Sequence, residues 1–288
     1  MAFNLSVFKT RAISAVIFAA IMISGLVYNQ WTFLALFTVI NFGCWWEFHR
    51  LMEKIDPTYK NVPNLLRYSM MLIGFAYMLY MSNPLIFPFG KWNLHDLGGY
   101  FLIAMAVLFL LGVVLFYKKV NINNLLTLLA GFLYISLSWG LMIKLRGRLN
   151  PYEQVDAGVL IPVILIASIW VNDTMAYIAG SLFGRRPLTS ISPKKTWEGT
   201  ITGVILSVLV VSYGGQYFHL PFRLLILISF LASVMGTFGD LFESKLKRMA
   251  GVKDSGSMMP GHGGFLDRFD SLLIATPYVW LFVDMFIA

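Results

Sequence analysis

Three aspartates lie near the ends of two apolar runs in the last third of the chain. Asp240 follows the run 224–238, whereas Asp267 and Asp270 lie where the run 269–288 begins. Asp267 and Asp270 are spaced i, i+3, so a helix that has already begun there presents both carboxylates on one face. Clustered carboxylates without a His or Cys partner favour a hard cation, Mg²⁺ first. The sequence therefore predicts a metal site at a helix–loop–helix junction.

The polar passage between these aspartates combines basic residues with glycines. Glycine lets the backbone approach a ligand closely, and a metal, basic side chains and bare amides together describe a phosphate site. The alternative is that the charges pair with one another and the glycines only form a turn. The basic residues are Lys245, Lys247, Arg248, Lys253 and Arg268, and the glycines are Gly251, Gly256, Gly261, Gly263 and Gly264.

The same passage resembles the signature of the phosphatidate cytidylyltransferases, which are the CDP-diacylglycerol synthases. Met259 departs from the pattern, because the family usually has Leu, Ile or Phe at that position. The resemblance implies a magnesium-dependent nucleotidyltransferase that converts CTP and phosphatidate into CDP-diacylglycerol and pyrophosphate. The matching residues are Ser244-x-Leu246-Lys247-Arg248-x4-Lys253-Asp254-x-Gly256 and Pro260-x-His262-Gly263-Gly264-Phe265-x-Asp267-Arg268-Phe269-Asp270.

The resemblance also implies roles for individual residues. The three carboxylates would hold one or two Mg²⁺ ions, namely Asp240, Asp267 and Asp270. Three basic side chains would bind phosphate during catalysis, namely Lys247, Arg248 and Arg268. Substrate contacts would come from Ser244, His262, Gly263 and Gly264. For His262, a phosphate contact and a hydrogen bond to an aspartate both remain open.

A second polar constellation begins inside an apolar stretch. Asp173 lies within the run 159–183, where a charge at the bilayer centre costs about 2.5 kcal/mol or more, so it suggests a function. A structural hydrogen bond to a neighbouring helix is the alternative. Further along, Ser192 and Pro193 predict a helix start, with Ser192 as the N-cap, and such a start also binds anions. The run from Asp173 to Gly199 resembles a second block of the same family, which implies substrate contacts by Asp173, Ser192, Lys194, Lys195, Thr196 and Glu198.

The composition identifies the class of protein. Hydrophobic residues make up 58% of the 288 residues and charged residues only 12%, which is outside the range of soluble domains. We therefore predict an all-α polytopic membrane protein, because helices satisfy their backbone groups internally in lipid. The single cysteine, Cys44, excludes an internal disulfide and is expected in the core. The nine predicted spans are 12–28, 31–46, 68–84, 99–117, 125–143, 159–183, 199–217, 224–241 and 269–287.

Loop charges predict the orientation of these spans. The distribution of Lys and Arg favours a cytoplasmic N-terminus, an outside C-terminus and a polar site that faces the cytoplasm. The net charge of +8 then reflects cytoplasmic loops and anionic headgroups rather than nucleic acid. We expect a cell-membrane protein, with a homodimer as one option. Residues 1–150 would form a supporting region of about five helices, and residues 151–288 would form the catalytic region, because both motif blocks lie there.

Three other functions compete with cytidylyl transfer. A CTP-dependent lipid or polyprenol kinase would use similar residues but would transfer the γ-phosphate. The CDP-alcohol phosphatidyltransferases fit poorly, because their motif needs Asp-Gly and Ala-Arg, whereas Asp270 is followed by Ser271-Leu272-Leu273. A cation transporter would explain Asp173 and Asp240. The Lys, Arg and Gly residues around these acids suit anionic substrates instead and would repel a passing cation.

Overall fold

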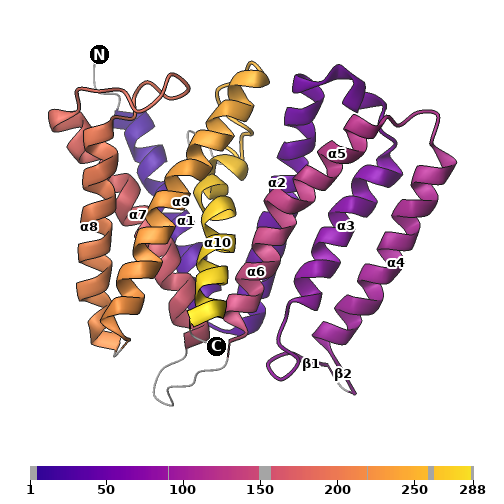
Figure 1. The fold of residues 1–288 in the computed structure, drawn as a ribbon, viewed down its shortest axis with the longest axis horizontal. Coiled ribbons are helices and arrows are strands. Elements are labelled where there is room, and N and C mark those ends of the chain that lie inside the picture. The colour runs from indigo at the N-terminus through magenta and orange to yellow at the C-terminus, as the bar shows by residue number, and fades with distance from the viewer. Residues whose placement is uncertain (1–4, 90, 149–156, 219, 259–262, 287–288) are drawn as a thin grey trace. The chain divides into compact units, whose positions relative to one another are not determined.

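The computed structural model of the chain describes residues 5–89, 91–148, 157–218, 220–258 and 263–286, and most of these residues are helical (Figure 1). The chain forms two compact units. The first unit contains residues 1–143 and 249–269, and the second contains residues 144–248 and 270–288. The loop that carries much of the predicted signature thus belongs with the N-terminal half, whereas Asp240 and Asp270 belong to the second unit.

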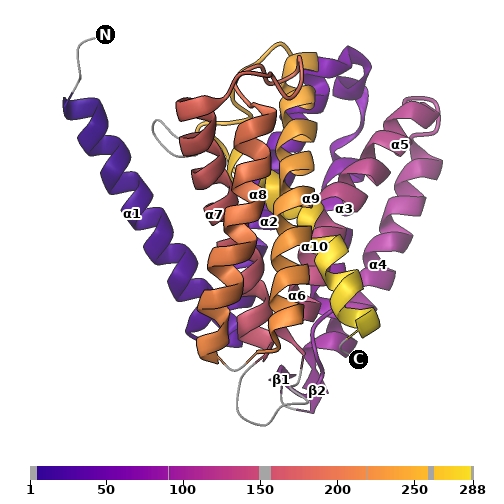
Figure 2. The same cartoon turned by 60° about the vertical axis from the view of Figure 1, so that its left-hand side comes forward.

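The elements follow the predicted apolar stretches closely. Figure 2 shows the same helices from a second side. The first unit contains α1 (Leu5–Val27), α2 (Gln30–Ile55), the 3₁₀ helix η1 (Pro57–Asn61), α3 (Asn64–Tyr80), α4 (Leu94–Leu115), α5 (Ile122–Gly131), the π-helical turn η2 (Phe132–Ser136) and most of α6 (Leu137–Arg146). The second unit contains α7 (Ala157–Phe183), α8 (Trp197–Gly215), the 3₁₀ helix η3 (Gln216–Phe218), α9 (Phe222–Met249) through Arg248, and α10 (Leu266–Phe286) from Asp270.

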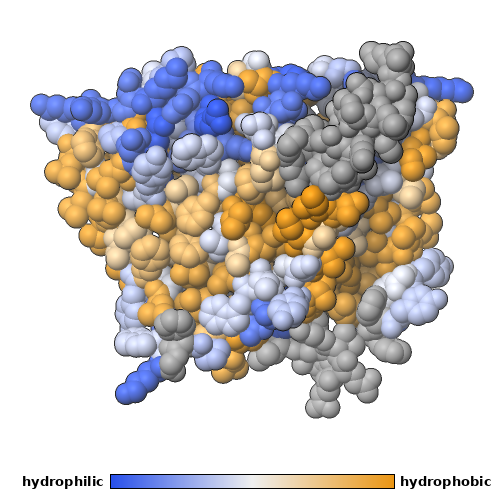
Figure 3. Space-filling model, turned by 180° about the vertical axis from the view of Figure 1, so that it is seen from behind, coloured by the Kyte–Doolittle hydropathy of each residue, from blue (hydrophilic) through white to orange (hydrophobic). Residues whose placement is uncertain are grey.

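The predicted spans are helical over most of their length, so the all-α prediction is confirmed in the described ranges. The strands are limited there to a short antiparallel pair, β1 (Pro88–Phe89) and β2 (Trp92–Asn93), in which Pro88 faces Asn93. On the face seen in Figure 3, hydrophobic residues cover the middle of the helices and hydrophilic residues gather at their ends. Six helices in the described ranges are long and apolar enough to cross a membrane: 94–115, 122–146, 158–183, 197–215, 222–249 and 266–286.

Helix α9 extends beyond its predicted end. The sequence predicted a span that ends at residue 241 and a polar loop after it, but the helix continues to Met249. The residues from Leu241 to Met249 have good helix propensity, and Glu243 pairs with Lys247 one turn later. The helix ends where Gly251 adopts a φ of 67°, a left-handed conformation that glycine tolerates. Asp240 therefore lies inside a helix rather than at its end.

The core of the first unit joins α2, α3 and η2. Trp45 is fully buried, and its Nε1 donates a hydrogen bond to Ser136 Oγ at 2.8 Å. The Ser136 hydroxyl in turn donates to Asn41 Oδ1 at 3.2 Å. Gly74 lets α3 approach this point, because a Cβ there would collide with the Ser136 side chain. Cys44 is buried beside this network, as the sequence predicted.

Hydrogen bonds between small polar residues connect three helices of the second unit. Ser207 on α8 donates to the carbonyl oxygen of Ser168 on α7 at 2.7 Å, and Ser233 on α9 donates to Ser207 Oγ at 3.0 Å. Gly203 brings α8 against α7, since a Cβ there would lie 2.7 Å from the carbonyl oxygen of Asn172. Small residues and serine hydroxyls are the contacts that hold helices together in lipid.

Low pH should destabilise the first unit through His49, which lies beyond the apolar part of α2. Its Nδ1 is 2.8 Å from the hydroxyl of Tyr59, and burial, together with the Arg67 cation, lowers the pKa of His49 to about 4. An unfolded histidine has a pKa of about 6.5. The unfolded chain therefore binds a proton that the folded protein lacks, and stability should fall by about 3 kcal/mol as the pH drops from about 6.5 to about 4.

Thermal unfolding in detergent between about pH 7 and about pH 4 measures this loss. His49→Gln should remove most of the pH dependence of the unfolding temperature. Tyr59→Phe is the matched control, because it removes the hydroxyl but keeps the imidazole, so the pH dependence should remain. Identical pH dependence in His49→Gln and the wild type would contradict the assignment.

Candidate functional site

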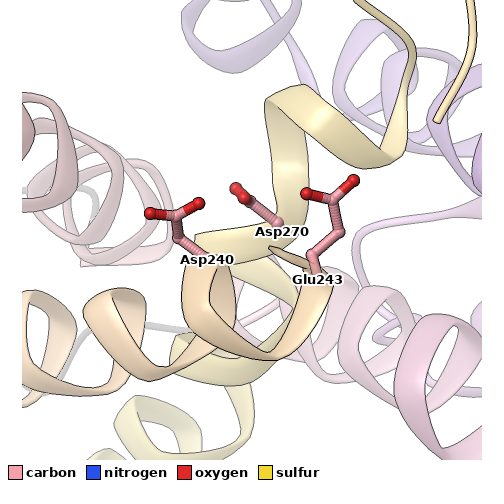
Figure 4. Close-up of side chains that lie close together, drawn as sticks. All are labelled: Asp240, Glu243 and Asp270. Carbon is pink, nitrogen blue, oxygen red and sulfur yellow. The ribbon is translucent and has the colours of Figure 1, made fainter. Parts of the chain in front are cut away.

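Three carboxylates meet in the second unit. Asp240 and Glu243 extend from α9, and Asp270 extends from the first turns of α10. Figure 4 shows the Asp270 carboxylate between those of Asp240 and Glu243. One ligand oxygen from each residue lies within 4.8 Å of the others. The three side chains therefore form a compact acidic cluster, which we call the carboxylate cluster.

Close packing of α9 against α10 creates this cluster. A Cβ at Gly239 would collide with the carbonyl oxygen of Asp270 and would lie 2.9 Å from the Cα of Ser271. Only glycine lets the two backbones come so near. Because Asp240 follows Gly239, the same contact brings its carboxylate to the first turns of α10. Glu243 and Asp270 are buried, whereas Asp240 is partly exposed.

Two lysines partly balance the negative charge. Lys195 forms an ion pair with Asp240, and Lys247 forms one with Glu243. Asp173 on α7 also belongs to this environment, because the charges of Lys195 and Asp240 act on it. Its Oδ1 accepts a hydrogen bond from Asn172 Nδ2 at 3.1 Å. The second unit therefore brings Lys195, a predicted phosphate-site lysine, together with Asp240 and Asp270, two of the three predicted metal ligands.

The donor set of the cluster fits a metal ion. The ligand atoms are all carboxylate oxygens, and no His or Cys belongs to the cluster among the described residues. Buried carboxylates are costly unless a cation compensates them, and oxygen ligands select hard cations. The cluster can therefore hold a metal ion of that class.

The loop before α8 is shaped by Glu198 and Thr196. Glu198 Oε2 accepts hydrogen bonds from the backbone amides of Arg185 and Arg186 at 3.1 and 3.2 Å. Pro187 pairs with Thr196 in an isolated antiparallel bridge. These contacts bring residues 185–187 next to residues 196–198, so the segment folds back on itself with Lys195 close to the start of α8. Glu198 thus has a clear structural role in addition to its predicted place in the nucleotide site.

The predicted helix start at Ser192 is wrong. Helix α8 begins at Trp197, and Thr196 is its N-cap, with Oγ1 accepting a hydrogen bond from Gly199 N at 3.2 Å. Ser192 instead begins a turn, in which its carbonyl oxygen accepts a hydrogen bond from Lys195 N at 3.0 Å. Pro193 fits the second position of such a turn as well as it fits a helix start. The sequence alone could not separate these two roles.

The segment from the end of α9 to the first turn of α10 (residues 250–267), which we call the signature loop, is organised around Asp267. Its Oδ2 accepts hydrogen bonds from Ser255 N at 2.8 Å, Ser255 Oγ at 2.9 Å and Gly264 N at 2.7 Å. Gly263 has a φ of 82°, which favours glycine. The structure therefore gives Asp267 a role in fixing the loop, and its predicted role as a metal ligand stays a prediction.

Glu47 holds the same loop from α2, and the sequence interpretation missed it. This buried carboxylate accepts hydrogen bonds from Ser255 Oγ at 2.8 Å and from the amides of Phe265 and Leu266, both at 2.9 Å. A Cβ at Gly264 would collide with it. Glu47 thus caps the N-terminus of α10 with a negative charge, which the helix dipole favours.

Comparison with known proteins identifies the family. The sequence model of the cytidylyltransferase family matches residues 9–286, nearly the entire chain. The chain belongs to the cytidylyltransferase family. This membership agrees with the resemblance seen in the sequence, and the matched residues include both motif blocks.

Relatives of this cytidylyltransferase-family protein include three bacterial proteins named phosphatidate cytidylyltransferase. The protein from Synechocystis sp. is 35% identical over 298 residues, which cover 95% of each chain. The protein from Helicobacter pylori strain J99 is 44% identical over 122 residues, 42% of this chain and 46% of the relative. The protein from Staphylococcus epidermidis is 38% identical over 180 residues, 61% of this chain and 65% of the relative.

The remaining predicted site residues of this family member have varied surroundings. Lys194, Arg248 and Arg268 are exposed, and Ser244 is buried on α9. His262 lies outside the described residues. Glu243 joins the metal-binding candidates although the sequence interpretation did not include it. Its signal was the i, i+3 spacing from Asp240, which places both side chains on one face of a helix that continues past residue 241.

Proposed function

We propose that this chain transfers the cytidylyl group of CTP to phosphatidate and forms CDP-diacylglycerol and pyrophosphate. The observation that carries the proposal is the match to a phosphatidate cytidylyltransferase over 95% of the chain. The carboxylate cluster and its two lysines support it, because they combine a cation site with positive charge that can face phosphate.

The reaction joins two anions. An oxygen of the phosphatidate phosphate attacks the α-phosphorus of CTP, a new P–O bond forms there, and the bond from the α-phosphorus to the β-phosphate oxygen breaks. Pyrophosphate leaves with that bonding pair. The second pKa of a phosphate monoester is about 6, so the nucleophile is largely dianionic at neutral pH and needs no strong general base. Catalysis therefore depends mainly on alignment and on neutralising charge.

Residues of the second unit would supply most of the charge neutralisation. We assign Asp240, Glu243 and Asp270 to one or two Mg²⁺ ions, which would neutralise phosphate charge when bound. Lys195 and Lys247 already lie against the carboxylates and would exchange these ion pairs for contacts with phosphate oxygens. Further phosphate contacts are proposed for Lys194, Arg248 and Arg268, and substrate contacts for Asp173, Ser192, Thr196, Glu198, Ser244, Gly263 and Gly264.

The membrane arrangement follows from the same proposal. We propose nine spans with a cytoplasmic N-terminus and a site that faces the cytoplasm, where CTP is available. The distribution of Lys and Arg in the loops supports this orientation. Phosphatidate would enter from the side while its acyl chains stay in the bilayer. In this scheme residues 1–150 support the catalytic residues 151–288, and the protein resides in the cell membrane.

The test measures pyrophosphate and CDP released from CTP by purified protein in detergent, with and without phosphatidate and Mg²⁺. We expect pyrophosphate only when all three are present, together with an equal amount of CDP-diacylglycerol. Formation of CDP without pyrophosphate would indicate a lipid or polyprenol kinase. If a folded sample with Mg²⁺ forms neither product, both enzyme assignments fail and ion transport becomes the next hypothesis.

A further inference from the structure

A small polar pocket lies in the first unit, and it shares no residue with the carboxylate cluster. It is bounded by the C-terminal half of α2 and by the loop that follows α9, and its volume is about 160 Å³. That volume is well below the roughly 300 Å³ at which pockets for entire small molecules begin. The pocket therefore fits one charged group rather than a complete nucleotide. Its lining residues are Arg50, Leu51, Lys54, Asp254, Ser255, Gly256 and Ser257.

The α2 side of the pocket is positively charged. Arg50 and Lys54 are spaced i, i+4, so both side chains extend from one face of the helix. Both are exposed, and within the described part of the chain neither forms a salt bridge with an acidic residue. Asp254 also lines the pocket, so the charged side chains there sum to +1, two cations minus one anion. The pocket thus favours an anion, and Asp254 weakens that preference.

The opposite side of the pocket is held in a fixed shape. Ser255 donates its hydroxyl to Glu47 and its amide to Asp267, both at 2.8 Å. A side chain at Gly256 would collide with the Glu47 carboxylate, so the backbone there lies close to α2 only because glycine has no side chain. The charge of Glu47 is itself directed to the N-terminus of α10, where two backbone amides donate to it. The loop therefore forms a fixed side of the pocket, opposite the cationic side chains of Arg50 and Lys54.

We propose that this pocket binds a phosphate group of one of the two substrates through Arg50 and Lys54. The inference rests on the proposed function for the source of the phosphate. Two sources share the chemistry, namely the headgroup of phosphatidate and the β- or γ-phosphate of CTP. Arg and Lys together suit such a group, because charge-assisted hydrogen bonds to phosphate are short and strong.

Direct binding to the full-length protein in detergent tests the proposal. Isothermal titration calorimetry would use inorganic pyrophosphate as the probe for the nucleotide and dihexanoyl phosphatidate as the probe for the lipid headgroup. In the double variant Arg50→Gln/Lys54→Gln, one probe should bind about 10-fold or more weakly than to the wild type. Because both side chains are exposed, the variant is expected to fold. The probe that loses affinity identifies the source of the phosphate.

Two controls make the test specific. Lys60→Gln/Lys119→Gln removes the same charge from exposed positions of the same unit and should change either affinity by less than about 2-fold. Asp254→Asn keeps the shape of the pocket but removes its negative charge, so the affected probe should bind as tightly as to the wild type or more tightly.

The proposal is overturned by any of three results. These are absence of binding of both probes to the wild type, unchanged binding in Arg50→Gln/Lys54→Gln, and an equal loss in the Lys60/Lys119 control. Binding needs no turnover, so failure of the proposed function is recognised separately. If the wild type forms no CDP-diacylglycerol, the proposed activity is refuted. If the wild type nevertheless binds a probe that the Arg50→Gln/Lys54→Gln variant binds more weakly, the anion site stands.

Discussion

Replacing Asp270 by Asn should lower the rate of CDP-diacylglycerol formation by a factor of about 10²–10³ or more. Asn nearly preserves the volume of the side chain but removes one of the negative charges that face one another in the carboxylate cluster. The remaining carboxylates would bind a divalent cation more weakly, so the Mg²⁺ concentration for half-maximal rate should rise together with the fall in kcat. Steady-state pyrophosphate release over a Mg²⁺ series measures both quantities.

A matched control lies on the same helix. Asp284 is partly exposed on α10, and its Oδ1 is 3.8 Å from Arg148 Nη1, so Asp284→Asn also removes one carboxylate charge but leaves the carboxylate cluster intact. Its rate should stay within about 2-fold of the wild type, because such exposed pairs contribute little. A wild-type rate in Asp270→Asn, or an equal loss in Asp284→Asn, would remove the carboxylate cluster from the mechanism.

Unfolding separates a catalytic loss from a structural one. Asp270 lies close to two other carboxylates, and like charges repel, so Asp270→Asn should unfold at the same temperature as the wild type or higher when Mg²⁺ is chelated. Added Mg²⁺ should then raise the unfolding temperature of the wild type more than that of the variant, because a ligand stabilises the state that binds it. An inactive variant that is equally stable without metal identifies Asp270 as functional.

Hydropathy located the helices well but not their polar ends. Each apolar stretch became a helix, because a backbone in lipid must satisfy its own hydrogen bonds. Hydropathy falls after residue 241, yet α9 continues to Met249, supported by helix propensity and by the Glu243–Lys247 ion pair. Glu243 was missed for that reason, although its spacing from Asp240 was visible. Caps depend on local geometry, which explains why Thr196 rather than Ser192 is the N-cap of α8.

Glu47 could not be found from the sequence. Its partners in the signature loop are 208 to 219 residues away, and no local pattern indicates which element will cover that loop. Trp45, two residues before Glu47, is fully buried, which shows that this face of α2 lies against the protein core. Contacts between residues so far apart in the sequence can be identified only from the tertiary structure, whereas a motif within one segment can be identified from the sequence.

Replacing Glu47 by Ala should loosen the signature loop and abolish activity. The variant would leave the part-buried amide of Phe265 and the buried amide of Leu266 without their acceptor, while Ser255 would keep Asp267 as a partner. Each buried group without a partner costs about 1–3 kcal/mol. We therefore expect faster hydrogen exchange at these two amides, a lower unfolding temperature and a rate reduced by about 10²-fold or more, since small misplacement of aligned groups has effects of that size.

Two further variants decide whether Glu47 acts by positioning the loop. Glu47→Gln keeps an acceptor oxygen, so it should restore part of the exchange protection and part of the activity. Glu53→Gln on the same helix breaks the ion pair with Arg67 instead. It should lower the unfolding temperature without changing exchange at Phe265 and Leu266. A contrary result is that Glu47→Ala unfolds at a lower temperature and still protects these two amides from exchange as the wild type does. In that case Glu47 only stabilises the fold, because a positioning role requires a loss of exchange protection at the N-terminus of α10.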